Sequence, residues 1–413
     1  MRPDVIVVGA GLAGLGTAWR LGERGHAVVV LEAADQPATE ATAQNAGMVR
    51  RLGDDPVERA LALRSHAFYA HELATQADFA DLEVARRTGA LLLLGHEPRR
   101  LHDAAAHLAA NGVHLDFLDG ASAIGAATPS PIAATARARV AFWDADALVA
   151  DAAALCRGYL RGLRRHGTEV RCGTQVTGLL VESGRCVGVR TSTGEVGGAA
   201  VVLATGAWGS ALAATAGLER PLLPMRRTLL QSARHEAARP DHPWIWLDDA
   251  GIYVRPQAGG FLGSPCDERL ELPRRPPTGG EGRSSLRAPG AEAIALHVAK
   301  IERLLPALRG LRWRQGWSGL RTFCPDRAPM LGPDRALPGL HWCSGLGGYG
   351  VSCGPAATDG VAAAIEGAWP GWLDAEAVRP DRAHAQRTPF VPDGDVGRAR
   401  LLDVAAAMRS LGT

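Results

Sequence analysis

One stretch near the N-terminus limits the possible folds more than any other. An apolar strand predicted at residues 5–8 runs directly into a G-x-G-x-x-G loop at residues 9–14. In such a loop Gly9 permits the tight turn, Gly11 lets the backbone approach a pyrophosphate, and Gly14 lets the following helix pack close to its strand. The pattern predicts the first strand and helix of a dinucleotide-binding β-α-β unit.

The next two elements complete this unit. A helix predicted at residues 12–24 aims its N-terminal amides and the positive end of its dipole at phosphates. A second strand at residues 27–31 ends on Glu32, whose carboxylate can accept hydrogen bonds from ribose hydroxyls and repels a 2′-phosphate. We therefore expect an ADP-containing cofactor other than NADP, and the motif by itself leaves FAD and NAD open.

The composition is typical of a globular protein without a strongly charged surface. At 413 residues the chain suits two domains, and its 45 basic and 43 acidic residues leave a net charge of +2. This balance gives no reason to expect nucleic acid or an anionic membrane as a partner. Because the first strand leaves no room for a signal peptide, no apolar run has transmembrane length and the seven cysteines are scattered, we expect a cytoplasmic location.

Periodicity along the chain predicts two kinds of unit. Helices are predicted at residues 56–77, 98–111, 146–166 and 397–411, and strands at residues 89–95, 169–172, 176–182, 185–191 and 200–204. Short segments punctuated by Pro and Gly at residues 222–331 indicate antiparallel strands, with a mobile loop at residues 273–290. Residues 340–345 and a helix from about Pro355 to Gly367 return to the α/β pattern.

We expect an α/β fold in which a Rossmann-type nucleotide-binding domain is interleaved with a mostly antiparallel α+β substrate domain. The nucleotide-binding domain is predicted to be discontinuous, because its pattern is interrupted and resumed. Its predicted segments are residues 1–85, 145–220 and 332–370; the substrate domain takes residues 86–144 and 221–331, and residues 371–413 form a C-terminal tail.

Two later glycine-rich turns suit contact with the same cofactor. The strand at residues 200–204 is followed by Thr205, Gly206 and Trp208, and small residues there allow backbone to pack against a dinucleotide. Such a turn is equally common in an ordinary α/β crossover. The loop at residues 345–355 is denser in glycine and leads into a helix, so its amides suit a flat ring or its negative charge.

Taken together, these motifs resemble the D-amino acid oxidase-like family of FAD-dependent oxidoreductases, which includes glycine oxidases, sarcosine oxidases and D-amino acid dehydrogenases. The resemblance covers nearly the whole chain and is closest to bacterial D-arginine dehydrogenase. The segments that carry it are residues 157–165, 226–227, 253–259, 262–265, 319–321 and 347–350.

The resemblance implies FAD as the cofactor, bound noncovalently, because the covalent attachment position of sarcosine oxidases aligns with Gly319 and not with Cys324. It also implies that Val176 contacts the adenine through its backbone and that residues 42–48 lie beside the flavin. The cofactor-binding residues are then expected to be Gly9, Gly11, Leu12, Ala13, Gly14, Glu32, Ala33, Thr42, Ala43, Asn45, Ala46, Gly47, Met48, Val176, Ala204, Thr205, Gly206, Trp208, Gly345, Gly347, Gly348, Tyr349, Gly350 and Val351.

Four residues are expected to act on the substrate. Arg321 matches the carboxylate-binding arginine of the family, and a guanidinium fork can hold a carboxylate in a bidentate, oriented way. Tyr253 matches a tyrosine that supports the same carboxylate. Arg227 matches a further arginine facing the substrate, although a one-residue slip would exchange it for Arg226. Tyr349 either binds the substrate amino group or caps its loop.

Several departures from D-arginine dehydrogenase argue against arginine as the substrate. Residues 88–91 contain no acid for a distal guanidinium, and Met48 and Leu346 replace polar residues, so we expect a neutral, hydrophobic side chain. Arg50 and Arg51 are expected to be solvated loop charges, with attraction of an acidic substrate as the alternative. Lys300, in a helix predicted at residues 294–305, is expected to face solvent. None of the 13 histidines lies in a metal-binding spacing.

The resemblance implies oxidative deamination of a D-amino acid to a 2-oxo acid and ammonia by hydride transfer from Cα to flavin N5. The electron acceptor is expected to be a quinone or another acceptor in preference to O2. One alternative is oxidation of a secondary or cyclic amine, as in sarcosine or proline oxidation, or of an amine in a natural product. A third possibility is a flavin-binding protein that has lost its activity.

Overall fold

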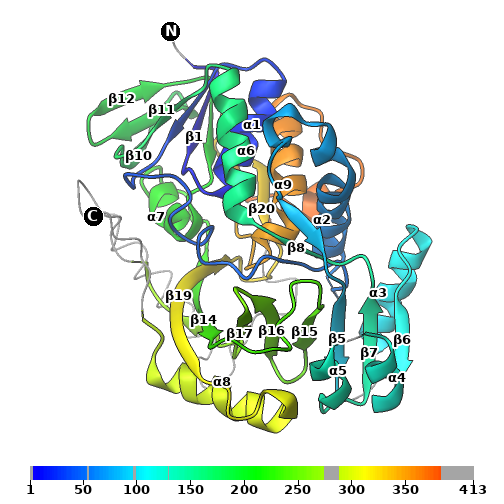
Figure 1. Ribbon diagram of the computed structural model, residues 1–413. Helices are drawn as coiled ribbons and strands as arrows, with labels where there is room; N and C mark the ends of the chain where they lie inside the picture. Colours follow the sequence, from blue (N-terminus) through cyan, green and yellow to red (C-terminus); the bar gives the residue numbers. More distant parts are fainter. Residues whose placement is uncertain (1–2, 54, 96–98, 129, 274–287, 383–413) are drawn as a thin grey trace.

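The computed structural model describes residues 3–53, 55–95, 99–128, 130–273 and 288–382. It is built as two parts, one around a mostly parallel sheet that contains β1, Val5–Val8, and the other around a mostly antiparallel sheet that contains β14, Leu223–Ser232 (Figure 1). The helix predicted at residues 397–411 and most of the loop predicted at residues 273–290 lie outside the described residues.

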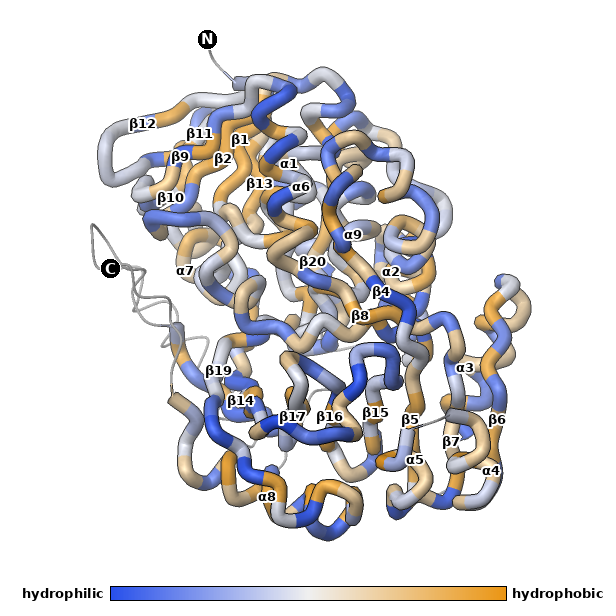
Figure 2. The backbone as a smooth tube through the Cα atoms, in the orientation of Figure 1, coloured by the Kyte–Doolittle hydropathy of each residue, from blue (hydrophilic) through white to orange (hydrophobic). Residues whose placement is uncertain are grey.

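The first part contains a six-stranded sheet drawn from three distant stretches of the chain. Its order is β20-β21-β13-β1-β2-β9, parallel except for the β20-β21 pair. The central strands are buried throughout, as expected of a parallel sheet covered on both faces, and they form the hydrophobic centre in Figure 2. The strands are β1 Val5–Val8, β2 Val28–Leu31, β9 Glu169–Arg171, β13 Ala200–Leu203, β20 Met330–Pro333 and β21 Leu340–Ser344.

Alternate residues of β1 enter two different cores, because successive side chains of a strand point to opposite faces. Val5 and Val7 pack with a helical layer, whereas Ile6 and Val8 pack with a three-stranded antiparallel sheet. The helices are α1 Leu12–Glu23, α2 Pro56–Ala67, α6 Ala152–Arg165 and α9 Gly350–Ile365; the strands of the small sheet are β10 Val176–Glu182, β11 Arg185–Thr191 and β12 Gly194–Gly197.

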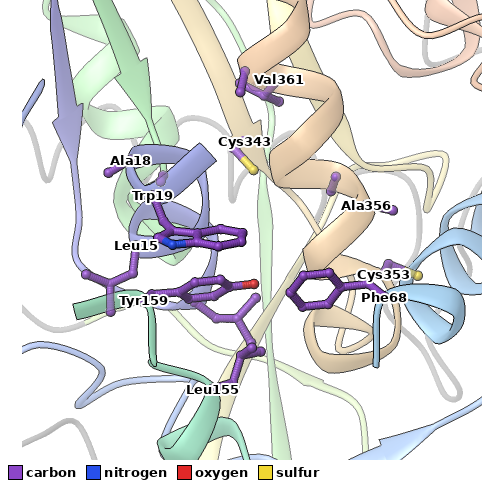
Figure 3. Close-up of a cluster of buried hydrophobic side chains, with 14 of the residues drawn as sticks. Leu15, Ala18, Trp19, Phe68, Leu155, Tyr159, Cys343, Cys353, Ala356 and Val361 are labelled. Atoms are coloured by element: carbon purple, nitrogen blue, oxygen red, sulfur yellow. The ribbon is translucent and has the colours of Figure 1, made fainter. Parts of the chain in front are cut away.

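Aromatic rings from several segments pack against one another inside the helical layer. Trp19 of α1 lies 5.3 Å from the Tyr159 ring of α6 and 6.2 Å from the Phe68 ring that follows α2. Leu155, Cys353 and other apolar side chains fill the space around these rings (Figure 3). Burial of rings this large stabilises the layer that supports the N-terminal glycine loop.

The second part is a large sheet that is antiparallel except where β15 pairs with β5. The β14-β19 pair forms its longest ladder, in which Met225 lies opposite Arg321 and Arg227 opposite Gly319. Helix α8, Ala291–Leu304, packs at the base of this part (Figure 1). The strands are β5 Ala90–Leu94, β6 Asp116–Asp119, β7 Val140–Asp144, β14 Leu223–Ser232, β15 Trp244–Leu247, β16 Ile252–Gln257, β17 Gly260–Ser264, β18 Arg269–Leu270 and β19 Trp313–Phe323.

Several short elements lie outside the sheets described above. A small sheet runs in the order β3-β8-β4. The short elements and remaining helices are β3 Met48–Val49, β4 Ala85–Arg87, β8 Leu148–Ala150, α3 Arg99–Ala110, α4 Ala121–Ala126, α5 Pro131–Thr135, α7 Gly209–Ala214 and α10 Ala375–Val378, the π-helical turn Phe68–Glu72, and 3-10 turns at Leu73–Thr75, Ala77–Phe79, Gly206–Trp208 and Pro306–Leu308.

The predicted fold class, a Rossmann-type α/β unit interleaved with a mostly antiparallel one, is confirmed, with corrections to single elements. The helix predicted from residue 146 begins at Ala152, because Leu148–Ala150 pairs as a strand and the Asp151 carboxylate caps the helix. The helix predicted from Pro355 begins at Gly350, inside the glycine-rich loop. In the described ranges no helix is both long and apolar enough to span a bilayer.

Candidate active site

A cavity of about 630 Å³ lies where the two parts of the molecule meet. Its lining comes from the loop after β1, the end of β2, residues 40–50, the turn after β13, the loop after β21, and the strands β14, β16 and β19. Every residue predicted to bind cofactor or substrate lines this cavity except Gly14 and Ala43. Ala43 is exposed, and its neighbour Gln44 takes the place in the lining.

The N-terminal glycines have the close contacts that the sequence predicts. Gly9 has a φ of +100°, and a Cβ there would lie 2.6 Å from the Ala204 carbonyl oxygen. A Cβ on Gly14 would lie 1.8 Å from the Gly9 carbonyl oxygen, so this glycine allows close helix packing and does not itself face the cavity. Gly11 is the N-cap of α1. The helix therefore begins directly at the cavity, where its dipole favours a phosphate.

Glu32 lines the cavity directly after the last residue of β2. Its carboxylate accepts hydrogen bonds from the backbone N–H of Ala10 at 2.6 Å and of Ala34 at 2.9 Å. Burial raises the pKa of this carboxyl group, and the two backbone hydrogen bonds oppose the shift. A carboxylate has lone pairs for about four donors, so acceptor capacity remains for ribose hydroxyls.

Orphaned polar atoms mark the next section of the cavity. The Gln44 side-chain amide and the Thr205 hydroxyl are buried and have no hydrogen-bond partner among the described residues. Buried polar groups are normally satisfied, so these atoms fit a cofactor that supplies the missing partners. A Cβ on Gly319 would lie 1.8 Å from the Gln44 amide oxygen, which explains why this position lacks a side chain. Together with the glycine loops, these groups fit FAD.

The turn between β21 and α9 brings backbone to the part of the cavity that Arg321 also lines. Gly345, Gly347 and Gly348 have φ values of +71°, +60° and +84°, which favour glycine. A Cβ on Gly348 would lie 2.4 Å from Arg321 Cδ, so the absence of a side chain also makes room for the arginine. Helix α9 then starts at Gly350 with its N-terminal turn in the cavity lining.

Two arginines and a tyrosine enter the cavity from the large sheet. Arg321 of β19, Arg227 of β14 and Tyr253 of β16 all line it. Arg226 points to the other face of β14 and lies within 4.0 Å of carboxylate oxygens on Asp267 and Glu271, so the lining contains Arg227 as predicted. Burial raises the pKa of Tyr253, and Arg227 opposes this shift.

Glu268 was not predicted, although it pairs with both cavity arginines. Its Oε1 lies 2.5 Å from Arg321 Nη2 and 3.1 Å from Arg227 Nη2, and its Oε2 lies 2.6 Å from Arg327 Nη2. Burial raises the pKa of this carboxyl group, but the three arginines outweigh burial and lower it. The only signal in the sequence is the acidic pair Asp267-Glu268 after a strand, which by itself is typical of a solvated turn.

The predicted exposure of Arg50, Arg51 and Lys300 is wrong. Arg50 is 7% exposed and lines the cavity; it pairs with Glu58 at 2.9 Å, and its guanidinium carbon lies 4.6 Å from the Trp246 ring centroid. Arg51 is 6% exposed. Its guanidinium pairs through two nitrogens with Asp144, so burial is compensated for both arginines.

Lys300 is half-buried and holds backbone in place. Its Nζ donates hydrogen bonds to the carbonyl oxygens of Gly251 at 2.7 Å and Pro265 at 2.8 Å. This correction follows from tertiary contacts, because the carbonyl groups belong to the ends of β16 and β17. Cys324 is fully buried and outside the cavity lining, as expected for a residue that does not bind the cofactor covalently.

An apolar wall forms part of the cavity lining beside Arg227, because Leu229 follows two residues later on the same face of β14. Met48, Leu229, Trp246 and Tyr253 belong to one packed cluster, and all four line the cavity. Tyr349 also lines the cavity, and its hydroxyl oxygen accepts a hydrogen bond from Arg50 Nη2 at 3.1 Å. Burial raises the pKa of Tyr349 to about 12. At ordinary pH its hydroxyl is therefore neutral and retains its proton.

The arrangement is that of a dinucleotide-dependent oxidoreductase. A glycine loop of the kind that binds phosphates and a carboxylate at the end of β2 line the same cavity as two guanidinium groups and an apolar wall. In enzymes with a site of this kind the cofactor supplies the reactive chemistry, and the protein binds and orients the substrate.

Comparison with known proteins establishes the family. Residues 4–364 match the family model described as FAD dependent oxidoreductase (DAO), and the chain belongs to this family and uses FAD. It is 30% identical over 364 residues to a glycine oxidase of Pseudomonas aeruginosa, covering 86% of this chain and 93% of the relative. It is 29% identical over 199 residues to the sarcosine oxidase subunit beta of Rhizobium meliloti, covering 46% of this chain and 44% of the relative.

Solved structures share this fold. L-proline dehydrogenase from P. horikoshii superposes with a TM-score of 0.80 at 21% sequence identity, covering 94% of this chain and 99% of that one. The protein is thus an FAD-dependent oxidoreductase that acts on amine groups.

Proposed function

We propose that the protein deaminates a D-amino acid with a neutral, hydrophobic side chain, giving the 2-oxo acid and ammonia. The observation that carries this proposal is the pairing of two arginines, Arg227 and Arg321, with an apolar wall inside one cavity. The arginines suit the carboxylate that all amino acids share, and the wall suits a side chain without charge. The D configuration is taken from the resemblance of the motifs to D-amino acid dehydrogenases.

Each residue has a defined task in this proposal. Arg321 anchors the carboxylate with Arg227 and Tyr253, which fixes the orientation of the Cα–H bond. The Tyr349 oxygen accepts a hydrogen bond from Arg50, and its second lone pair can accept one from an N–H of the substrate amino group. FAD, held noncovalently by the glycine loops and Glu32, supplies the two-electron acceptor. The imino acid product is hydrolysed by water.

We further propose a quinone or another organic acceptor, in preference to O2, for reoxidation in the cytoplasm. Lys300, the single lysine of the chain, hydrogen-bonds to two backbone carbonyls at the ends of β16 and β17. Lys300 is also not among the described residues that line the cavity, so we assign it no role in a reaction with O2. Turnover in air, compared with turnover with an artificial acceptor under argon, measures the preference.

A secondary amine is the second candidate. The sarcosine oxidase subunit beta that matches nearly half of this chain acts, by its name, on an N-methylated amino acid. Such a substrate uses the same carboxylate anchor and differs only in the group beside Tyr349. N-methylglycine and D-proline therefore belong in any substrate panel.

The test is anaerobic reduction of the bound flavin by a panel of D- and L-amino acids, glycine, N-methylglycine and D-proline. We expect flavin bleaching to be fastest with D-leucine, D-methionine or D-phenylalanine and slow with D-aspartate and D-arginine. Bleaching only by secondary amines would replace the first candidate with the second. Absence of bleaching by every amine in the panel would refute both.

A further inference from the structure

Three guanidinium groups converge on one carboxylate beside the cavity. Glu268 pairs with Arg227, Arg321 and Arg327, while its own side chain is 19% exposed. The cavity lining includes Arg227 and Arg321 but, among the described residues, not Glu268. The carboxylate therefore contacts the two cavity arginines from behind and leaves their pocket side open.

Without this carboxylate two like charges would stand side by side in a buried place. Burial and the neighbouring Arg227 lower the pKa of Arg321, and Glu268 acts in the opposite direction. Each guanidinium carries five N–H donors, and each of the two gives one of them to Glu268 Oε1. Because both guanidinium groups bind the same oxygen atom, they lie close together. Each still has further N–H donors for a ligand.

The chain fixes Glu268 through its neighbour Asp267. On one side β14 pairs with β18 at Met225 and Arg226 and with β17 at Leu230 and Gln231, which leaves a gap between them. Asp267 fills the gap by accepting hydrogen bonds from Thr228 N at 2.7 Å and Thr228 Oγ1 at 2.8 Å. The acidic pair is thus attached to the same strand that carries Arg227.

The start of this segment is anchored as well. Cys266 has a φ of +54°, a left-handed conformation that only surrounding contacts maintain in a non-glycine residue. Lys300 holds the carbonyl of Pro265, the residue before it. The turn after β17 is therefore constrained at both its first residue and at Asp267, which limits where the Glu268 carboxylate can lie.

We propose that Glu268 is a positioning residue for substrate binding: it holds Arg227 and Arg321 together as one two-arginine site for a single carboxylate. This inference rests on the proposed function, because it assigns the arginines to the substrate carboxylate.

The test uses the FAD-loaded enzyme and benzoate, a monocarboxylate that cannot be oxidised as an amine. The dissociation constant is measured from the change in flavin absorbance on titration. For Glu268→Gln we expect the Kd for benzoate to rise about tenfold or more, because a neutral amide no longer offsets the repulsion between the two guanidinium groups and they move apart. The rate of flavin reduction at saturating substrate should stay within about threefold, because no group at the reacting bond is changed.

Glu271→Gln is the matched control. It removes the same charge from the same segment, but Glu271 lies beside Arg226, outside the cavity. Its Kd for benzoate should stay within about twofold of the wild type. Glu268→Asp keeps the charge and shortens the reach, so an intermediate rise is expected, and it serves as the test if Glu268→Gln does not retain FAD.

Three outcomes would overturn the inference. An unchanged or lower Kd in Glu268→Gln would show that Glu268 only neutralises or competes for the arginines. If the Kd for benzoate rose equally in Glu271→Gln, the effect would come from the loss of any nearby negative charge. If Glu268→Asp kept the wild-type Kd, the exact position of the carboxylate would not matter. If wild-type enzyme gives no response to benzoate, the carboxylate site of the proposed function fails together with the inference; a failed amine panel with intact benzoate binding refutes the function alone.

Discussion

Arg321, the proposed carboxylate anchor, keeps its charge although burial and Arg227 both lower its pKa. An arginine stays protonated in proteins, whereas a lysine in the same place would lose its charge more readily. Its side chain passes over Gly348, and its guanidinium carbon lies 5.0 Å from the Phe323 ring centroid. Packing of the stem thus determines where the fork points.

Replacement of Arg321 by Met should separate anchoring from folding. Methionine keeps an apolar stem but removes every donor, so the KM for the amino acid should rise by about 100-fold, the equivalent of about 3 kcal/mol. Steady-state kinetics with the best amino acid of the panel measure this rise. Arg226→Met is the control, because Arg226 faces away from the cavity and its loss should leave KM nearly unchanged. A KM for Arg321→Met close to that of the control would exclude the anchor.

At the scale of single elements, the turn between β21 and α9 joins the cofactor end of the cavity to the substrate end. Gly345, Gly347 and Gly350 line the cavity together with Gly348, which also touches Arg321. Ser352 in the first turn of α9 binds the Met48 carbonyl oxygen at 3.0 Å and the Arg50 N–H at 3.1 Å. The start of α9 therefore positions β3 as well as the glycine-rich turn that precedes the helix.

Gly348→Ala should disturb both ends at once. Residue 348 has a φ of +84°, in the left-handed region that disfavours alanine. Its new Cβ would lie 2.4 Å from Arg321 Cδ, so the arginine must move. We expect a KM at least about tenfold higher and a lower FAD content after purification, measured from the flavin-to-protein absorbance ratio. Gly367→Ala has a similar φ of +75° but no atom within 4 Å of its Cβ, so it isolates backbone strain of about 1–2 kcal/mol. Equal effects of the two changes on KM would contradict this explanation.

At the scale of the whole molecule, a buried histidine outside the cavity lining makes stability depend on pH. His297 of α8 is 0% exposed, its ring packs edge-on against Trp313 at 4.1 Å, and neither ring nitrogen has a partner among the described residues. Burial lowers its pKa from 6.5 to about 3. The unfolded chain therefore binds more protons than the folded chain between about pH 3 and 6.5, and the free energy of unfolding falls as the pH is lowered through this window.

His297→Leu should remove this part of the pH dependence. The histidine costs up to about 1.4 kcal/mol of stability for each pH unit below 6.5, whereas leucine has no proton to bind. Urea unfolding of the holoenzyme at pH 8 and pH 5 measures the difference. We expect the wild type to lose more stability than the variant on going to pH 5. An equal loss in both proteins would show that His297 does not titrate separately in the two states.

The sequence predicted the parts of the site that local patterns encode. Gly9, Gly14 and Glu32 could be placed because turn, helix packing and strand end follow one another within about thirty residues. Arg321, Tyr253 and Arg227 were placed through family motifs, and all three line the cavity. The domain boundaries and the roles of these residues stay predictions.

The prediction that a helix begins at residue 146 was wrong because of contacts with distant parts of the chain. Residues 148–150 have helical spacing of apolar side chains, yet they pair with β3 and β4. Strand pairing satisfies their backbone groups, and the Asp151 cap then starts the helix later. A pattern read from one segment cannot include partners that lie elsewhere in the chain.

By itself, the sequence determined the dinucleotide cradle, the α/β fold class and the family, because glycine conformations and strand periodicity are local properties. Only the tertiary structure decided that Arg50 is buried against Glu58 and Trp246 and that Glu268 binds two cavity arginines 41 and 53 residues away. The physical reason is that burial and charge pairing depend on groups brought together by packing. A charged residue in an irregular segment carries no periodic pattern that reveals its partner.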